Sequence, residues 1–156
     1  MTLQVTIDVR PEDFNLGEEV QKLADTHSGV GATVSFVGYV RDFSEAENVL
    51  GLELEHYPGM TEKSLQAIAE QAGQRWSLDG MTIIHRIGRL LTGEQIVLVV
   101  TASAHRGDAF AACEFVMDYL KVDAPFWKKE ITAEGEHWVD AREGDTSRAQ
   151  KWQLDD

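Results

Sequence analysis

Three of the chain's six lysines, Lys121, Lys128 and Lys129, fall within nine residues in the stretch YLKVDAPFWKKE. The chain has a formal net charge of −13, so a cationic cluster works against the background potential and needs a reason. Lysines gathered in this way are suited to binding an anion and to moving protons beside it. The structural alternative is that they stabilise a helix end and lay their stems over Trp127. The residues alone leave both interpretations open.

The order of residues in this stretch predicts which lysines can meet. Pro125 ends the preceding helix, because proline cannot continue a helix and keeps the residue before it out of α geometry. Lys121 then closes that helix, and the segment after Pro125 is a strand whose side chains alternate between two faces. Lys128 shares a face with Glu130, whereas Lys129 points to the other face. Lys121 and Lys128 can meet only if the chain turns back after Pro125, and of the two strand lysines Lys128 is then the candidate, because Glu130 can orient it or hold a proton.

A second group of cationic side chains is found where a strand gives way to a helix, in TASAHRGDAF at 101–110. His105 and Arg106 lie at the expected helix start, where free backbone N–H groups and the helix dipole favour an anion. A solvated helix start, with Arg106 paired to Asp108 or Glu114, accounts for the same residues. Arg41 opens a polar loop after the strand SFVGYV, where binding residues often lie, and is equally an ordinary solvated arginine.

Cys113 is the only cysteine of the chain, and it lies on the apolar stripe of a predicted helix. A core position is the expected role for such a residue, with a catalytic thiol as the alternative. The other histidines do not have metal-ligand spacing with one another or with Cys113; they are His27, His56, His85 and His137. We therefore expect neither a metal site nor a cofactor.

The composition bounds the class of protein. The chain has 156 residues, 43% hydrophobic and 26% charged, which predicts one globular domain. Its acidity argues against nucleic acid as a partner, since neutralising phosphates needs many lysines and arginines. The longest apolar run, IVLVVTA at 96–102, is too short to cross a bilayer, and the N-terminal residues do not resemble a signal peptide. A single cysteine fits a reducing compartment, so we expect the cytoplasm.

Hydrophobic periodicity predicts an α+β domain over residues 1–141, with antiparallel strands and two long helices. Leu50, Leu52 and Leu54 are expected to face inward from one strand, and Gly38 to allow a close approach or a bulge in another. RLLTGE is expected to be a turn, and Glu134-Gly135 the tip of a hairpin. Residues 142–156 are expected to form a polar, mobile tail, with a short terminal helix. The predicted strands are 3–9, 31–40, 49–57, 81–88, 95–103 and the two arms of the hairpin, and the long helices are 60–76 and 107–121.

Four blocks of this sequence together resemble the large, catalytic subunit of molybdopterin synthase, the MoaE family. They are GATVSFVGYVRD, LELEHYPGMTEKSL, IIHRIGRLLTGE continuing to TASAHRGDAFAACEFVMDYLK, and APFWKKE. The resemblance extends from about Gly31 to Arg142, and the order and spacing of the blocks make it specific. It implies an α/β-hammerhead-type fold and a homodimer that binds a small ubiquitin-like subunit at each end, giving a heterotetramer.

The resemblance also implies a reaction. The small subunit ends in a Gly-Gly thiocarboxylate, which transfers sulfur to cyclic pyranopterin monophosphate and forms the dithiolene of molybdopterin. Carried over by position, Lys121 and Lys128 are the catalytic lysines. Lys121 is assigned to the terminal carbonyl of the small subunit and Lys128 to the pterin. The substrate-binding residues implied by the same positions are Tyr39, Val40, Arg41, His105, Arg106, Lys129 and Glu130.

One segment departs from the family pattern, because the loop DFSEAENV after Arg41 lacks the glycine that many members carry. Other classes of function remain as alternatives to sulfur transfer by lysines. One is a non-catalytic module that docks a ubiquitin-like partner or a phosphate. Another is an acyl- or sulfur-transfer enzyme that uses Cys113 as its nucleophile, and a third is a stable acidic domain with a chance basic patch.

Overall fold

The computed structural model describes residues 3–42, 48–139 and 143–153, and in these ranges the chain forms two sheets of four strands each. In the first sheet the strand order is β1-β4-β6-β2, and only the pair β1–β4 is parallel. The second sheet has the order β5-β3-β7-β8 and is antiparallel throughout. The bounds are β1 Gln4–Arg10, β2 Ala32–Tyr39, β3 Gly51–His56, β4 Gly80–Arg86, β5 Gly88–Leu91, β6 Gln95–Ser103, β7 Phe126–Thr132 and β8 Gly135–Val139.

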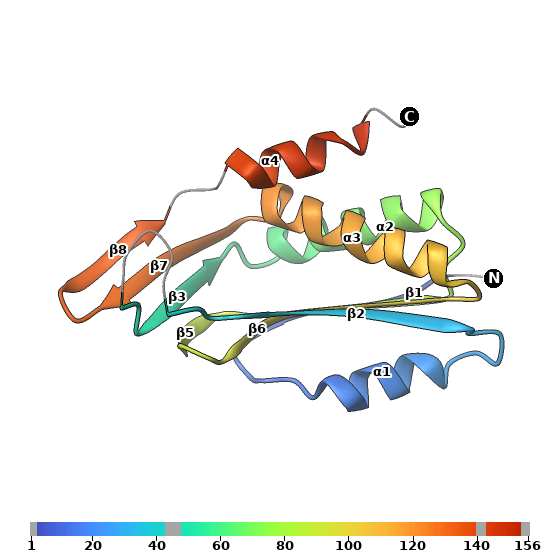
Figure 1. The fold of residues 1–156 in the computed structure, drawn as a ribbon, viewed down its shortest axis with the longest axis horizontal. Coiled ribbons are helices and arrows are strands. Elements are labelled where there is room, and N and C mark those ends of the chain that lie inside the picture. The colour runs from blue at the N-terminus through green and yellow to red at the C-terminus, as the bar shows by residue number, and fades with distance from the viewer. Residues whose placement is uncertain (1–2, 43–47, 140–142, 154–156) are drawn as a thin grey trace.

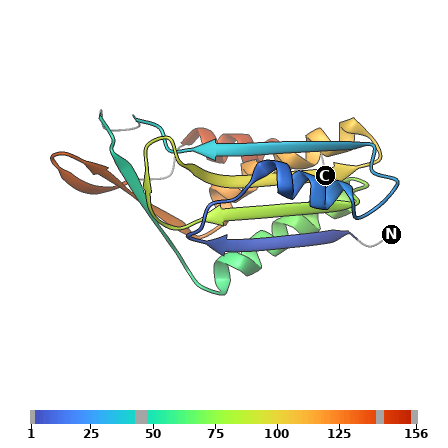
Figure 2. The same ribbon diagram turned by 90° about the horizontal axis from the view of Figure 1, so that it is seen from below.

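Helices cover both faces of the first sheet, as Figures 1 and 2 show. α1 (Leu16–Ala24) packs on one face, while α2 (Met60–Arg75) and α3 (Arg106–Asp123) pack on the other. α4 (Glu143–Gln150) lies over α3 on its outer side (Figure 1). None of the helices in the described ranges is long and apolar enough to cross a membrane. The α+β class with two long helices is thus confirmed.

The end of α3 is built as the sequence predicts. Ala124, next to Pro125, has extended backbone angles of φ −78° and ψ 128°, so the helix stops there. The N–H of Phe126 donates to the carbonyl of Ala124 at 2.9 Å, and β7 begins at once. This tight exit leads the chain from the last turn of α3 directly into the middle of the second sheet. Lys121 and Lys128 are therefore brought to the same side of the molecule.

Two local predictions are wrong. Residues 89–91 of the predicted turn RLLTGE belong to strand β5 (Gly88–Leu91), which pairs with β3 and buries Leu90. Four residues give too short a pattern to separate a strand from a turn. Leu50 is 52% exposed instead of buried, because the register of β3 with both its neighbours begins at Gly51. Leu52 and Leu54, inside that register, are buried as predicted.

The C-terminal segment contains the short helix that the sequence predicts, α4, and it packs against the body of the domain. Trp152 is buried beside Trp76 and Phe115, and its indole N–H donates to an Asp118 carboxylate oxygen at 2.8 Å. The carbonyl of Trp152 accepts from Arg75 at 2.8 Å. A domain boundary at residue 141 and a mobile tail stay predictions. Residues 140–142, like 43–47 of the loop after Arg41, lie outside the described ranges.

Candidate functional site

A pocket of about 430 Å³ lies where the end of α3 meets the second sheet. Its walls come from β2, the residues between β2 and β3, and the elements β3, β6, α3 and β7. Cationic side chains converge on it from three of these segments. The polar residues that line it are Tyr39, Arg41, Lys121, Lys128 and Glu130. Residues that the sequence separates by more than 80 positions thus share one cavity, and all of them are predicted site residues.

The strand β7 delivers two of these side chains. Lys128 stands opposite Leu54 of β3, and Glu130 stands opposite Leu52, so both side chains lie on one face of the second sheet. The pairing of β2 with β6 shifts register between Gly38 and Tyr39. A Cβ at Gly38 would come within 2.9 Å of Val97 Cγ1, so glycine permits this close approach. The irregularity ends β2 at the pocket wall.

Glu130 is the most deeply buried of these groups, with 0% of its surface exposed. One carboxylate oxygen, Oε2, lies 3.1 Å from Nε2 of His137 on β8. The other, Oε1, is buried and has no hydrogen-bond partner among the residues that the structure describes. A buried carboxylate is costly unless charges or donors compensate it. The lysines of the same pocket provide compensating positive charge.

Lys129 and Val40 do not line this pocket. Lys129 lies on the opposite face of β7, within 3.9 Å of Glu53 and 3.7 Å of Glu136, and 4.6 Å from the ring centre of Trp138. The strand-period prediction that Lys129 faces away from Lys128 is therefore confirmed. Val40 is buried in a small apolar cluster of the second sheet. The substrate-binding roles that the family resemblance gave to these two residues stay predictions.

His105 and Arg106 are exposed at the opposite end of α3 from Lys121. Fifteen residues of α-helix separate Arg106 from Lys121, which corresponds to about 22 Å, and Figure 1 shows the length of this helix. The structure therefore does not bring the two groups together within one chain. Both side chains are solvated at the helix start, as the structural alternative expects, but the described residues show no ion pair of Arg106 with Asp108 or Glu114. Asp108 accepts from the Ser77 N–H at 3.3 Å, and Glu114 pairs with Lys151.

Comparison with known proteins decides the family. The sequence profile of the family described as "MoaE protein" matches residues 9–123. The molybdopterin synthase catalytic subunit of Pseudomonas aeruginosa is 57% identical over 96% of this chain and 99% of its own length. That of Vibrio cholerae is 56% identical over 94% of this chain and 97% of its own length. The chain belongs to the MoaE family.

Solved structures agree with this assignment. A MoaE protein from Burkholderia ambifaria has a TM-score of 0.83 and 53% identity, with 96% of this chain and 99% of that chain covered. A complex of subunits 1 and 2 of molybdopterin-converting factor from Helicobacter pylori has a TM-score of 0.72 at 23% identity, covering 88% of this chain and 91% of that chain. At that identity the second likeness supports the fold alone. The close relatives confirm the prediction of a molybdopterin synthase catalytic subunit, and with it an enzyme that transfers sulfur.

His85 does not line the pocket, but the charges of Lys121 and Lys128 act on it, and the sequence suggested no role for it beyond that of a metal ligand. The ring is 4% exposed, stacks on Phe126 with centroids 3.7 Å apart, and donates from Nδ1 to the carbonyl of Arg86 at 2.8 Å. Burial, with the charges of Lys121 and Lys128 acting in the same direction, lowers its pKa to about 3. A neutral imidazole therefore lies beside the two lysines at neutral pH. Its signal in the sequence is a histidine within an otherwise apolar strand.

Cys113 of the MoaE chain occupies the core, as predicted, and does not lie in the pocket. It packs between α2, α3 and the first sheet. Burial raises the pKa of the thiol to about 12, and the charge of Glu114 acts in the same direction. The thiolate is the nucleophilic form of cysteine, so a thiol with this pKa is unsuited to attack near neutral pH. In the described ranges, no group of histidine, cysteine or acidic side chains is arranged to hold a metal ion.

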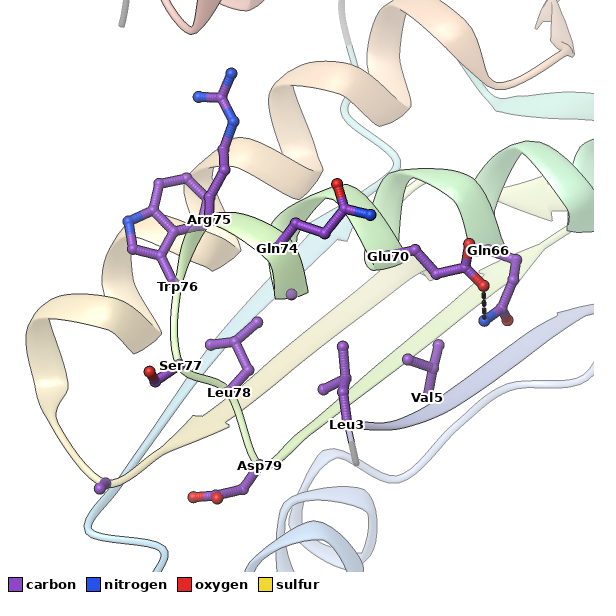
Figure 3. A pocket seen from close by; sticks show the side chains of 12 residues that line it. Leu3, Val5, Gln66, Glu70, Gln74, Arg75, Trp76, Ser77, Leu78 and Asp79 are labelled. Carbon is purple, nitrogen blue, oxygen red and sulfur yellow. Dashed lines mark hydrogen bonds between the residues drawn. The ribbon is translucent and has the colours of Figure 1, made fainter. Parts of the chain in front are cut away.

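A larger cavity of about 900 Å³ lies elsewhere, between α2 and the edge strand β1. Figure 3 shows Leu3, just before β1, and Val5 of β1 on one side of it, with Gln66 and Glu70 of α2 on the other. Gln66 donates to Glu70 at 3.3 Å, and Arg75 donates to the carbonyl of Trp152. None of the predicted site residues lines this cavity. The smaller pocket with converging cations remains the candidate site.

Proposed function

We propose that the pocket between α3 and the second sheet is the sulfur-transfer site of this MoaE chain. The observation that carries this proposal is the convergence of Arg41, Lys121 and Lys128 on one cavity in a protein whose net charge is −13. Cyclic pyranopterin monophosphate and a C-terminal thiocarboxylate are both anions. Bringing two anions together requires positive charge at the place where they meet.

In this reaction the two lysines transfer protons. The thiocarboxylate sulfur attacks a carbon of the pterin side chain, and the displaced oxygen leaves with a proton. Water then hydrolyses the resulting thioester, which leaves sulfur on the pterin and a carboxylate on the small subunit. A second round adds the second sulfur of the dithiolene. Lys121 is placed at the carbonyl of the small subunit and Lys128 at the pterin, where each acts as proton donor or acceptor.

The partner is a small ubiquitin-like subunit whose C-terminal Gly-Gly enters the pocket. The Helicobacter pylori complex described above supports a two-subunit assembly for that protein. In this chain, two large aromatic side chains are about half exposed: Tyr39, which lines the pocket, and Trp127 on β7. They offer apolar surface to a docking partner. The single cysteine fits the cytoplasmic location expected from the sequence.

A homodimer reconciles His105 and Arg106 with a role at this site. Both lie about 22 Å along α3 from Lys121, so a single chain does not unite them with it. A second copy placed across a two-fold axis presents its own helix start to the first copy's pocket. The partner copy then supplies an arginine, an imidazole and free helix N–H groups for the phosphate of the pterin.

Product formation by the purified chain tests the function. The chain is mixed with a thiocarboxylated small subunit and cyclic pyranopterin monophosphate, and molybdopterin is measured. Binding of the small subunit is measured in parallel by titration calorimetry. Product formation supports the proposal. Tight partner binding without product would identify a docking module instead.

Mixing of variants tests the dimer. Arg106→Ala and Lys121→Ala are each expected to be inactive, because each leaves every site of its homodimer defective. When the two are refolded or exchanged together in equal amounts, half of the dimers are mixed and each has one intact site. About a quarter of wild-type activity should return. No recovery, although exchange is demonstrated by mass spectrometry, would refute a site shared between copies.

A further inference from the structure

The buried Glu130 is connected to a histidine on the neighbouring strand. β7 and β8 are antiparallel, and Glu130 stands directly opposite His137 in their register. Nε2 of His137 lies 3.1 Å from Oε2 of Glu130. The Glu130 side chain is 1% exposed, whereas the His137 side chain is 44% exposed. One hydrogen bond therefore joins the most buried acid of the site to a ring in contact with solvent.

The two residues line different cavities. Glu130 lines the sulfur-transfer pocket. His137 lines a second pocket, of about 510 Å³, formed by the hairpin turn and Asn48. Glu130 does not line that second pocket, and His137 does not line the first. The hydrogen bond between them thus spans the wall that separates the two cavities.

The chemistry of the pair fixes the direction of this bond. An ionised carboxylate only accepts hydrogen bonds, so Nε2 of His137 carries the hydrogen and donates it to Glu130. Histidine is also the side chain whose charge ordinarily changes between about pH 5 and pH 8. An imidazole can take a proton from solvent on one nitrogen and release one from the other. A buried carboxylate that is hydrogen-bonded to such a ring can therefore exchange protons with solvent through the ring.

Charged groups surround the pair on both sides. Around Glu130 they come from β7, α3 and the segment after β2, and around His137 they come from the hairpin. The groups are Lys128, Lys121 and Arg41 on the pocket side, and Glu134 on the side of the second pocket. Glu136 also lines the second pocket, but its carboxylate pairs with Arg89 and Lys129 on the other face of the hairpin. Cations thus line the pocket side of the pair, and an acid lines the side of His137.

We propose that His137 is a positioning residue of the sulfur-transfer site, which holds the Glu130 carboxylate in the pocket and relays protons between it and the second pocket. In each relay a proton moves from Nε2 of His137 to Oε2 of Glu130 while the ring takes up a proton at Nδ1 from solvent. No electron is transferred. Glu130 then passes the proton into the pocket, where the oxygen leaving the pterin needs one. This inference rests on the proposed function of the pocket.

The kinetic test compares His137→Ala with His137→Gln. Alanine removes the donor to a buried carboxylate, so kcat should fall about ten- to hundredfold while KM for the pterin changes little. The glutamine amide N–H stands near the position of Nε2, so His137→Gln should recover part of the rate. Because glutamine does not titrate, the pH profile of its kcat should differ from that of the wild type. His27→Gln, at the other end of the molecule, is the matched control and should behave as wild type.

Two results would overturn the inference. One is a His137→Ala variant with wild-type kcat across the pH range. The other is a His137→Gln variant whose kcat keeps the wild-type pH profile, since the titrating group would then be a different residue. A purely structural role is distinguished by thermal unfolding. It would lower the melting temperature of His137→Ala while leaving kcat per folded molecule and the pH profile unchanged.

A measurement without turnover separates this inference from the proposed function. Nitrogen-15 NMR of the histidine side chains reports which ring nitrogen carries the hydrogen. In the wild type, His137 should carry it on Nε2, and in Glu130→Gln this fixed preference should be lost. If the wild type makes no molybdopterin but shows this signature, the function of the pocket is wrong and the pair remains. A wild type that makes product while its His137 shows no preference for Nε2 refutes the inference alone.

Discussion

The buried His85 makes a prediction about acid stability that can be worked out from the structure. Its ring is 4% exposed and lies beside Lys121 and Lys128, and its pKa is lowered from 6.5 to about 3, chiefly by burial. Unfolding exposes the ring to water, where it binds a proton at higher pH than in the folded state. Stability from this residue is therefore fully present above about pH 6.5 and is lost as the pH falls toward about 3.

The substitution that isolates this effect is His85→Asn. The asparagine amide N–H stands near the position of Nδ1 and keeps the donor to the Arg86 carbonyl, while the titrating ring is lost. At pH 7 the variant should be less stable by about 2–3 kcal/mol, because the ring stacked on Phe126 leaves a cavity. One pKa unit corresponds to about 1.4 kcal/mol. The difference in unfolding free energy between the wild type and His85→Asn should therefore narrow by up to that amount per pH unit below pH 6.5. By pH 5 it should have closed by about 2 kcal/mol.

Equilibrium urea unfolding, followed by tryptophan fluorescence at pH 7, 6, 5 and 4, measures this gap. His27→Asn is the matched control, because it removes a histidine that is partly exposed and far from the lysines. The difference in unfolding free energy between this control and the wild type should not narrow as the pH falls, because His27 lies beside Asp79 and not beside the lysines. If the His85→Asn and wild-type curves are parallel, the ring is not held neutral by burial. The account of the lysine environment would then be wrong.

Three further predictions concern the core and the two faces of β7. Trp152→Ala should lower the free energy of unfolding by about 3–5 kcal/mol. Trp152→Phe should lower it by less, since only the hydrogen bond to Asp118 and part of the ring are lost. Urea unfolding that shows neither change would contradict the packing of α4. Cys113 should react slowly with thiol reagents in the native protein at pH 8, because burial raises its pKa to about 12. Labelling of Cys113 at the rate of a free thiol would contradict its burial in the core. Lys129→Ala should keep kcat within about fivefold of the wild-type value, because the partners of Lys129 are partly exposed acids. Lys128→Ala should lower kcat by about a hundredfold or more. Equal losses of kcat in the molybdopterin assay would place Lys129 in the site.

Sequence reasoning succeeds where a local rule determines the geometry. Pro125 ends α3, strand alternation puts Lys128 and Glu130 on one face, and Gly38 permits the irregular end of β2. Each of these follows from the residue itself or from its neighbours in the chain. They establish that Lys121 and Lys128 can meet if the chain turns back after Pro125, and the structure contains that turn.

Long-range pairing is what the sequence does not reveal. The contact of Glu130 with His137 depends on the register of the hairpin, which turns at Gly135 with a φ of +136°. The burial of Trp152 in a polar tail depends on the surface that α2 and α3 present to it. The separation of His105 from Lys121 was implicit in the length of the predicted helix, but the family resemblance groups both residues in one site. A site shared between two copies accounts for both observations.

The central claim is that the pocket at the end of α3 transfers sulfur with lysines. The most direct measurement is single-turnover formation of molybdopterin from cyclic pyranopterin monophosphate and a thiocarboxylated small subunit, with wild type beside Lys121→Ala. The account predicts product from the wild type and a rate at least about a hundredfold lower from Lys121→Ala, although that variant still binds the small subunit. A Lys121→Ala variant that makes molybdopterin at the wild-type rate would contradict it.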